Sequence, residues 1–108
     1  MKEVRLIQQG DVLFKEVSKL PAGTVQDNSV DSRGVVFAEG EVTGHYHGTS
    51  TPGITMFRKG DVRFALVERP KEVTHQEHGA VTLDPGIYEI GIVREIDPFS
   101  EEINRVRD

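Results

Sequence analysis

The chain has 108 residues, of which 36% are hydrophobic and 29% are charged, and these values fit one compact domain spanning residues 1–108. The formal net charge of −5 argues against general nucleic-acid binding, because affinity for phosphate backbones comes from clustered Lys and Arg, and here basic and acidic residues are interleaved. The absence of cysteine excludes disulfides, iron–sulfur clusters and thiolate zinc sites, so a bound metal must accept nitrogen and oxygen ligands.

Short runs of Val, Ile, Phe and Thr alternate with Gly, Pro and Asp turns along most of the chain. This pattern predicts an all-β fold, either a small barrel or a sandwich. The polar segment 26–33 is expected to be a surface loop. The expected strands are Val4–Gln8, Asp11–Val17, Gly34–Glu39, Glu41–His47, Ile54–Arg58, Asp61–Glu68, Glu72–Gln76, Ala80–Leu83 and Ile87–Glu95.

One short phrase occurs twice in the sequence. Gly10-Asp11-Val12-Leu13-Phe14 recurs as Gly60-Asp61-Val62-Arg63-Phe64. One interpretation is a pair of strands related by a pseudo-twofold axis. The other is that Gly-Asp-Val-x-Phe simply favours a turn followed by a strand with alternate apolar side chains facing the core.

The C-terminal segment differs from the rest of the chain and predicts a short helix at residues 97–107. Asp97 can cap the first turn, Pro98 suits the first helical position, and Glu101 stands one turn before Arg105. We expect this helix to cover one open end of the β structure, with docking of a partner as the alternative.

The N-terminal residues lack the long apolar stretch of a signal peptide. No later segment approaches the roughly 18 apolar residues that a membrane span requires. We therefore expect a soluble cytoplasmic protein with no membrane partner.

All four histidines fall between positions 45 and 78, and two of them form the His-x-His step of His45 and His47. On a strand, alternate side chains point to the same face, so both imidazoles would be presented together. Glu41 has the same parity and is a further oxygen donor on an uninterrupted strand, unless a bulge at Gly44 breaks the register.

The second pair, His75 and His78, is less determined by its spacing. On a regular strand His75 shares a face with Glu77, whereas His78 faces away. If the strand ends near Glu77 and the chain turns at Gly79, His78 can swing toward His75 instead. Strand parity therefore favours His75 with Glu77, and the turn geometry could substitute His78.

Three or four imidazoles, with or without a carboxylate, suit a divalent ion such as Zn, Fe, Mn or Ni. We therefore expect a metal site formed by His45, His47, His75 and His78. In a catalytic version of the site, the metal would polarise a small substrate or a water molecule, and Glu41 or Glu77 would take up the proton. The spacing does not decide whether the protein is an enzyme.

The segments 37–47, 74–79, 83–88 and 94–98 together resemble a group of small uncharacterised proteins of bacteria and their phages, and the similarity begins at the phrase Gln9-Gly10-Asp11-Val12. The resemblance implies no activity. It implies that the glycine, histidine and Pro-Gly-x-Tyr positions occur together in that group.

The His-x-His step is also similar, more loosely, to the first motif of the cupins, which are β metalloproteins. That similarity implies a cupin-like metal site in which His75 or His78 plays the later histidine. The cupin glutamate has no counterpart in the residues after His47, so Glu77 or Glu41 would have to replace it.

Two functions remain in competition. The first is a metal-binding β protein that acts on, or binds, a small molecule. The second is a non-enzymatic phage or bacterial β module that forms homo-oligomers or binds a host protein through exposed strand edges and the terminal helix.

Overall fold

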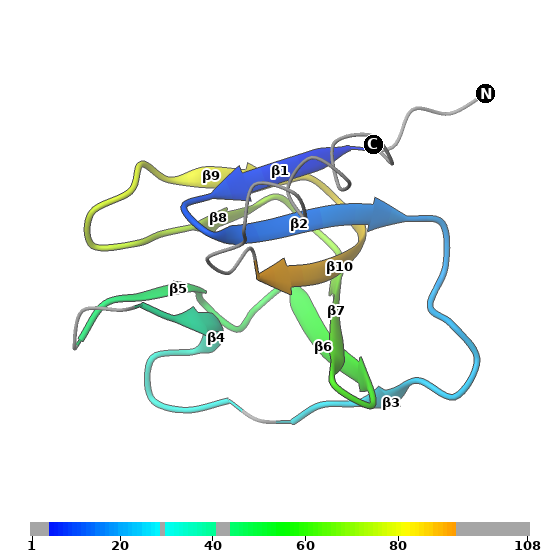
Figure 1. The fold of residues 1–108 in the computed structure, drawn as a ribbon. Helices are drawn as coiled ribbons and strands as arrows, with labels where there is room; N and C mark the ends of the chain where they lie inside the picture. Colours follow the sequence, from blue (N-terminus) through cyan, green and yellow to red (C-terminus); the bar gives the residue numbers. More distant parts are fainter. Residues whose placement is uncertain (1–4, 29, 41–43, 93–108) are drawn as a thin grey trace, which may run out of the picture.

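The computed structural model describes residues 5–28, 30–40 and 44–92, and the regular elements within these ranges are all β-strands. The helix predicted at residues 97–107 lies outside them, as does Glu41. The strands, shown in Figure 1, are β1 (Leu6–Gln9), β2 (Val12–Val17), β3 (Val25–Gln26), β4 (Val35–Glu39), β5 (Tyr46–Thr49), β6 (Ile54–Lys59), β7 (Val62–Val67), β8 (Lys71–Val73), β9 (Val81–Leu83) and β10 (Gly86–Ile92).

Six strands form one antiparallel sheet in the order β1-β2-β10-β7-β6-β3. Strands β1 and β3 are its two edges, so the sheet is open and is not closed into a barrel. The all-β prediction is confirmed, and the barrel alternative is wrong for the part of the chain that the structure describes.

The remaining strands form two antiparallel pairs, β4-β5 and β8-β9. These pairs are joined at one point, where Gly48 and Thr74 exchange two backbone hydrogen bonds of 3.1 and 2.9 Å. This bridge brings the segment around His47 next to the segment that begins at His75.

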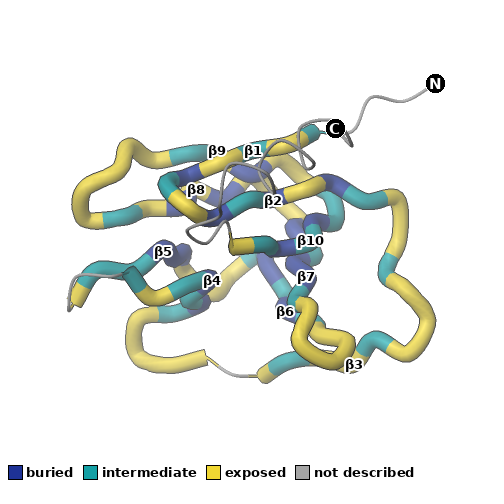
Figure 2. The backbone as a smooth tube through the Cα atoms, viewed as in Figure 1, coloured by how far each residue is buried: buried dark blue, intermediate teal, exposed yellow. Residues whose placement is uncertain are grey.

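The core lies where the small sheets pack against the large one. Buried and more exposed positions alternate along β2 and β10, as expected for strands with one face toward the core. Phe14 of β2 contacts Phe37 of β4 edge to face, with ring centroids 5.0 Å apart. Figure 2 shows the buried segments gathered between the sheets, and the core cluster comprises Val12, Phe14, Val35, Phe37, Ile54, Met56, Ala65, Val67, Val73, Leu83, Tyr88 and Ile90.

Two of the predicted strands differ from the observed ones in ways that affect the histidines. The strand predicted at Glu41–His47 is observed as β5, which begins at Tyr46, so His45 precedes the strand. The strand predicted at Glu72–Gln76 ends at Val73, so His75 follows it. A separate irregularity lies in β4, where the register with β5 shifts between Val36 and Ala38.

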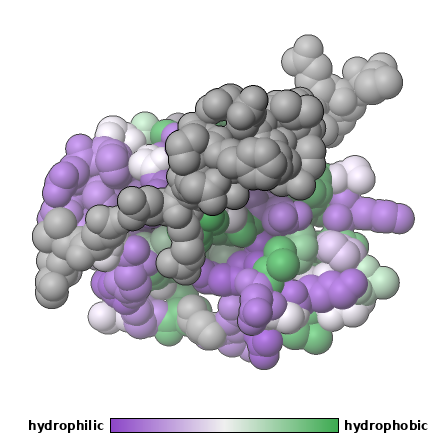
Figure 3. All heavy atoms as spheres, in the orientation of Figure 1, coloured by the Kyte–Doolittle hydropathy of each residue, from purple (hydrophilic) through white to green (hydrophobic). Residues whose placement is uncertain are grey.

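The described surface is polar over most of the face shown in Figure 3, with smaller hydrophobic areas between the polar side chains. Its exposed large hydrophobic residues come from separate segments: Leu6, Val25, Val30, Val62 and Ile92. Among the described residues, the structure contains no helix that is long and apolar enough to cross a membrane.

The turn between β9 and β10 supplies a test of the fold. Tyr88 is completely buried, and its hydroxyl donates a 2.7 Å hydrogen bond to the carbonyl oxygen of Asp84. We expect Tyr88→Phe to lower the free energy of unfolding by about 1 kcal/mol in urea denaturation. Tyr46→Phe, in a partly buried ring, is the control and should change it by less than about 0.5 kcal/mol. Equal effects would show that the hydroxyl of Tyr88 does not hold this turn.

Candidate metal-binding site

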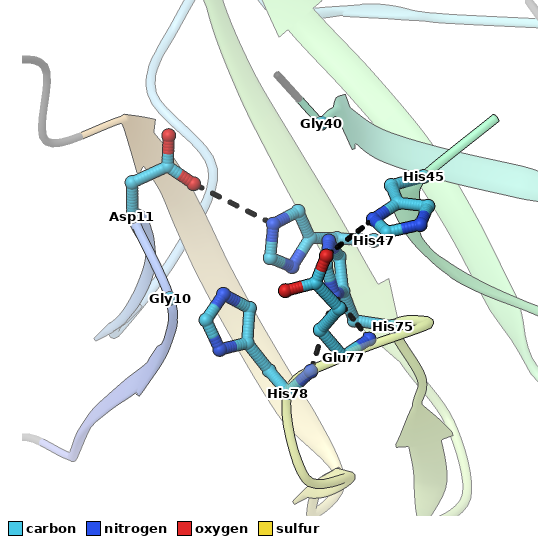
Figure 4. A pocket seen from close by; sticks show the side chains of 8 residues that line it. All are labelled: Gly10, Asp11, Gly40, His45, His47, His75, Glu77 and His78. Atoms are coloured by element: carbon cyan, nitrogen blue, oxygen red, sulfur yellow. Dashed lines mark hydrogen bonds and ion pairs between the residues drawn. The ribbon is translucent and has the colours of Figure 1, made fainter. Parts of the chain in front are cut away.

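All four histidines line one pocket of about 330 Å³, shown in Figure 4. Three stretches that are distant in sequence form it: the hairpin loop between β1 and β2, the segment from the end of β4 into β5, and the connection between β8 and β9. The lining residues are Gly10, Asp11, Gly40, His45, His47, His75, Glu77 and His78.

The imidazole rings are close neighbours within this pocket. The ring centroid of His75 lies 4.3 Å from that of His47, 4.6 Å from that of His78 and 5.6 Å from that of His45. The rings of His47 and His78 are stacked with centroids 6.0 Å apart. The fold therefore gathers the four predicted histidines, with His75 at the centre of the group.

His47 is the most rigidly held of the four. Its exposed fraction is 1%, and its Nδ1 lies 2.8 Å from Oε1 of Gln9. The side-chain amide nitrogen of Gln9 donates to the carbonyl oxygens of Val73 and Gly79, at 2.9 and 3.0 Å. Because both amide hydrogens of Gln9 are used in this way, its Oε1 must accept from His47. His47 therefore carries its proton on Nδ1 and presents the lone pair of Nε2 to the pocket.

Asp11 faces that lone pair. Its Oδ1 lies 3.5 Å from Nε2 of His47. The carboxylate of Asp11 is half-exposed, whereas the ring of His47 is buried, so the pair stands at the boundary between the core and the pocket. When Nε2 of His47 carries no proton, it and the carboxylate oxygen of Asp11 are both acceptors, so a cation between them would be favourable.

His45 has a carboxylate beside its ring in the same way. Nδ1 of His45 lies 3.1 Å from Oε1 of Glu77, which is the other predicted carboxylate. An acceptor at this position favours a proton on Nδ1 and leaves Nε2 as the basic nitrogen of His45. Glu77 is therefore placed to orient His45, and its own side chain is 62% exposed.

His75 has the opposite arrangement. Its Nδ1 accepts hydrogen bonds from the backbone amides of Glu77 and His78, at 3.0 and 3.2 Å. These two bonds close a turn directly after the bridge at Thr74, so the chain leaves the strand before His75. The premise that strand parity places His75 is therefore wrong. The turn brings His78 into the pocket, which was the alternative that the sequence left open.

Burial affects the protonation of the central rings. It lowers the pKa of His47 below the usual 6.5, the neighbouring His75 and His78 lower it further, and Asp11 opposes them. The pKa of His75 is lowered by burial and then by His78 and His45. Both rings therefore stay neutral, and able to bind a metal or a hydrogen-bond partner, at a lower pH than free histidine.

The described side chains do not form a finished coordination shell. We searched for three or more His, Cys, Asp or Glu side chains whose ligand atoms surround one point. Residues 5–28, 30–40 and 44–92 contain no such group. A metal bound at the pair of His47 and Asp11 therefore requires side-chain rotation to bring in a third ligand.

Gln9, Gly10 and Asp11 were not among the residues predicted for the site. Gly10 and Asp11 begin the repeated phrase Gly-Asp-Val-x-Phe, which drew attention to them in the sequence. The structure places the start of each copy in a hairpin loop. Each loop has two residues, and Gly10 and Gly60 occupy the same position with φ of 57° and 60°. The phrase therefore forms tight hairpins in both places, but only the first hairpin reaches the histidines.

The two hairpins allow a matched experiment. A Cβ at Gly10 would lie 2.6 Å from Nε2 of His78 and 3.3 Å from Cε1 of His47, whereas a Cβ at Gly60 meets nothing within 4 Å. Both alanine variants carry the same backbone strain, because the two glycines have similar φ values. We expect Gly10→Ala to shift the imidazole NMR signals of His78 and His47, and Gly60→Ala to leave them in place. The same shifts in both variants would show that the first hairpin does not form the floor of the pocket.

The lowered pKa values predict how stability depends on pH. Because His47 and His75 have lower pKa values in the folded protein, the unfolded chain binds more protons once the pH falls below about 6.5. The stability that these groups contribute is complete above that pH and is lost as the pH falls through their folded values. With chelator present, we expect urea denaturation to show a lower free energy of unfolding at pH 5.5 than at pH 7.5. His47→Asn should reduce this difference, and an unchanged difference would contradict the assignment.

Comparison with known proteins gave one match. The family described as a domain of unknown function (DUF8820) matches residues 8–93, which include every described residue of the pocket. No curated protein and no solved structure matches the chain.

Proposed function

We propose that this chain, which belongs to the DUF8820 family, binds one divalent transition-metal ion in the histidine pocket and uses it to hold a small ligand. The observation that carries the proposal is the pair of acceptor atoms formed by Nε2 of His47 and Oδ1 of Asp11. The family description supplies no activity, so the proposal rests on the geometry of the site.

The pair requires a positive charge between its two atoms. A proton could supply that charge, but burial lowers the pKa of His47 and disfavours the protonated ring. Gln9 also fixes the other ring nitrogen as the donor, so the ring cannot relieve the contact by moving its proton. A metal ion satisfies both atoms without protonating the buried imidazole.

The spacing of the pair suits one ion. Two ligands of a tetrahedral zinc ion, each about 2.0–2.2 Å from the metal, lie about 3.4 Å from each other. The observed separation of His47 Nε2 and Asp11 Oδ1 is 3.5 Å. The buried hydrogen bond from His47 to Gln9 is also the kind of support that orients metal-bound histidines in proteins.

The other ligands come from the remaining histidines by side-chain rotation. His45 presents Nε2 because Glu77 lies at its Nδ1, and His78 lies against the hairpin loop that carries Asp11. A nitrogen-rich set with one carboxylate suits Zn, Fe, Mn or Ni.

The chemistry of such a site depends on the open coordination position of the metal, on the nearby carboxylates and on the volume of the pocket. A tetrahedral ion with three protein ligands keeps its fourth position for water or for a small ligand, where it would act as a Lewis acid. Asp11 is used as a metal ligand in this proposal. Glu77 is then the other carboxylate among the described residues of the pocket, and it can take up a proton from a bound water or substrate. A volume of about 330 Å³ suits a small molecule rather than a polymer.

Metal analysis of untagged protein tests the proposal. We expect about one divalent ion per chain, and zinc affinity at least about 10-fold weaker in Asp11→Asn, measured by calorimetry at pH 7.5. Asp61→Asn changes the same position of the twin hairpin, away from the histidines, and should bind zinc like the unchanged protein. His45→Ala combined with His47→Ala should abolish stoichiometric binding while circular dichroism still shows the β fold.

Two outcomes would overturn the proposal. One is the absence of bound Zn, Fe, Mn or Ni at pH 7.5, which is above the ordinary pKa of an imidazole side chain. The other is an equal loss of zinc affinity in Asp11→Asn and Asp61→Asn, which would trace the effect to the hairpin turns rather than to the pocket.

A further inference from the structure

Three of the four histidines have a defined partner at Nδ1, and these partners separate them into two kinds. In His47 an oxygen acceptor holds Nδ1, and in His45 a carboxylate oxygen lies beside it. In His75 the same nitrogen accepts two backbone amides. The first arrangement leaves a lone pair on Nε2, whereas the second leaves a proton on Nε2, because a neutral imidazole has one of each.

A nitrogen that carries a proton cannot bind a metal. For Nε2 of His75 to become a ligand, the proton would have to move to Nδ1, where it would point at the amide hydrogens of Glu77 and His78. The alternative, rotation of the ring, would break both hydrogen bonds of the turn that brings His78 into the pocket. Either change costs hydrogen bonds that the observed arrangement satisfies.

The position of His75 shows what its proton can do. Its ring is the central one, within 5.6 Å of each of the other three ring centroids, and it lines the pocket. Because Nδ1 is directed at the turn, the free polar edge of the ring is the one that carries Nε2. The ring lines the same pocket as His47, and its centroid lies 4.3 Å from that of His47, so Nε2–H is the donor that His75 can offer to a ligand of an ion held there.

We propose that His75 is not a metal ligand and that its Nε2–H donates a hydrogen bond to the oxygen atom bound at the open position of the metal. This inference rests on the metal site proposed above and deepens it. The oxygen belongs to water or hydroxide in the resting protein and to a small oxyanion, such as a carboxylate, when ligand is bound. The pocket should accordingly favour oxyanions over amine ligands, which offer no acceptor once they are bound to a metal.

Nitrogen NMR of the unchanged protein tests this assignment directly. With ¹⁵N-labelled histidine and ¹¹³Cd²⁺ as the metal, we expect cadmium–nitrogen coupling to His47 and to at least one of His45 and His78. His75 should show none and should keep a directly bonded hydrogen on Nε2. Coupling between cadmium and either nitrogen of His75 would overturn the inference while leaving the metal site itself established.

Two variants separate the roles of the two ring nitrogens. His75→Asn places an acceptor where Nδ1 stands and removes the distal donor, whereas His75→Gln places an amide near Nε2 and removes the acceptor of the turn. In Co²⁺-loaded protein, followed by visible absorption, we expect His75→Asn to weaken acetate binding about 10-fold and to change Co²⁺ affinity by less than about threefold. His75→Gln keeps a donor near Nε2 but lacks the acceptor of the turn, so it should bind acetate more tightly than His75→Asn does. Loss of Co²⁺ affinity in His75→Asn by about 100-fold would identify His75 as a ligand and refute the inference.

The metal-free protein separates this inference from the function on which it rests. In the presence of chelator, the nitrogen shifts of His75 should report a hydrogen on Nε2, and those of His47 a hydrogen on Nδ1. If no cadmium binds but these shifts are found, the proposed metal site fails and the assigned ring protons stand. If His75 carries its hydrogen on Nδ1, the inference fails whether or not the metal binds.

Discussion

The side-chain amide of Gln9 holds the pocket together. It lies at the end of β1 and is 2% exposed. From there it bonds to the carbonyl oxygens of Val73 and Gly79 and to the ring of His47. One side chain thus ties the first hairpin to both ends of the β8–β9 connection that carries His75 and His78, and it fixes which nitrogen of His47 faces the pocket. Because a buried amide must satisfy all of its hydrogen-bonding groups, this orientation has little freedom.

A second constraint acts in the β8–β9 connection. The bridge between Gly48 and Thr74 places this connection beside β5, and the ring of His75 then ends the extended chain by accepting two backbone amides. His75 therefore shapes the backbone as well as lining the pocket. The same hydrogen bonds that bring His78 inward also direct the proton of His75 away from the turn, so local folding and the chemistry of the ring are linked.

The sequence predicted much of the fold because strands carry a local signal. β2, β6, β7 and β10 are six or seven residues long and rich in apolar residues, and their predicted bounds agree with the structure to within a few residues. The two-residue strand β3 is too short to carry such a signal. The end of β8 at Val73 was missed because it depends on a bridge to a residue 26 positions away and on a ring that caps the turn.

For the site, the sequence by itself determined the nature of the donors: four histidines in two close pairs with Glu77 beside them, and no thiol anywhere in the chain. The tertiary structure alone decided that Gln9 and Asp11 join them, that His75 stands at the centre, and which ring nitrogen of His45, His47 and His75 is free. The physical reason is that residue types fix what a side chain can bind, whereas the proton on an imidazole is placed by the acceptors and donors packed around it. Those neighbours come from strands that meet only when the chain folds.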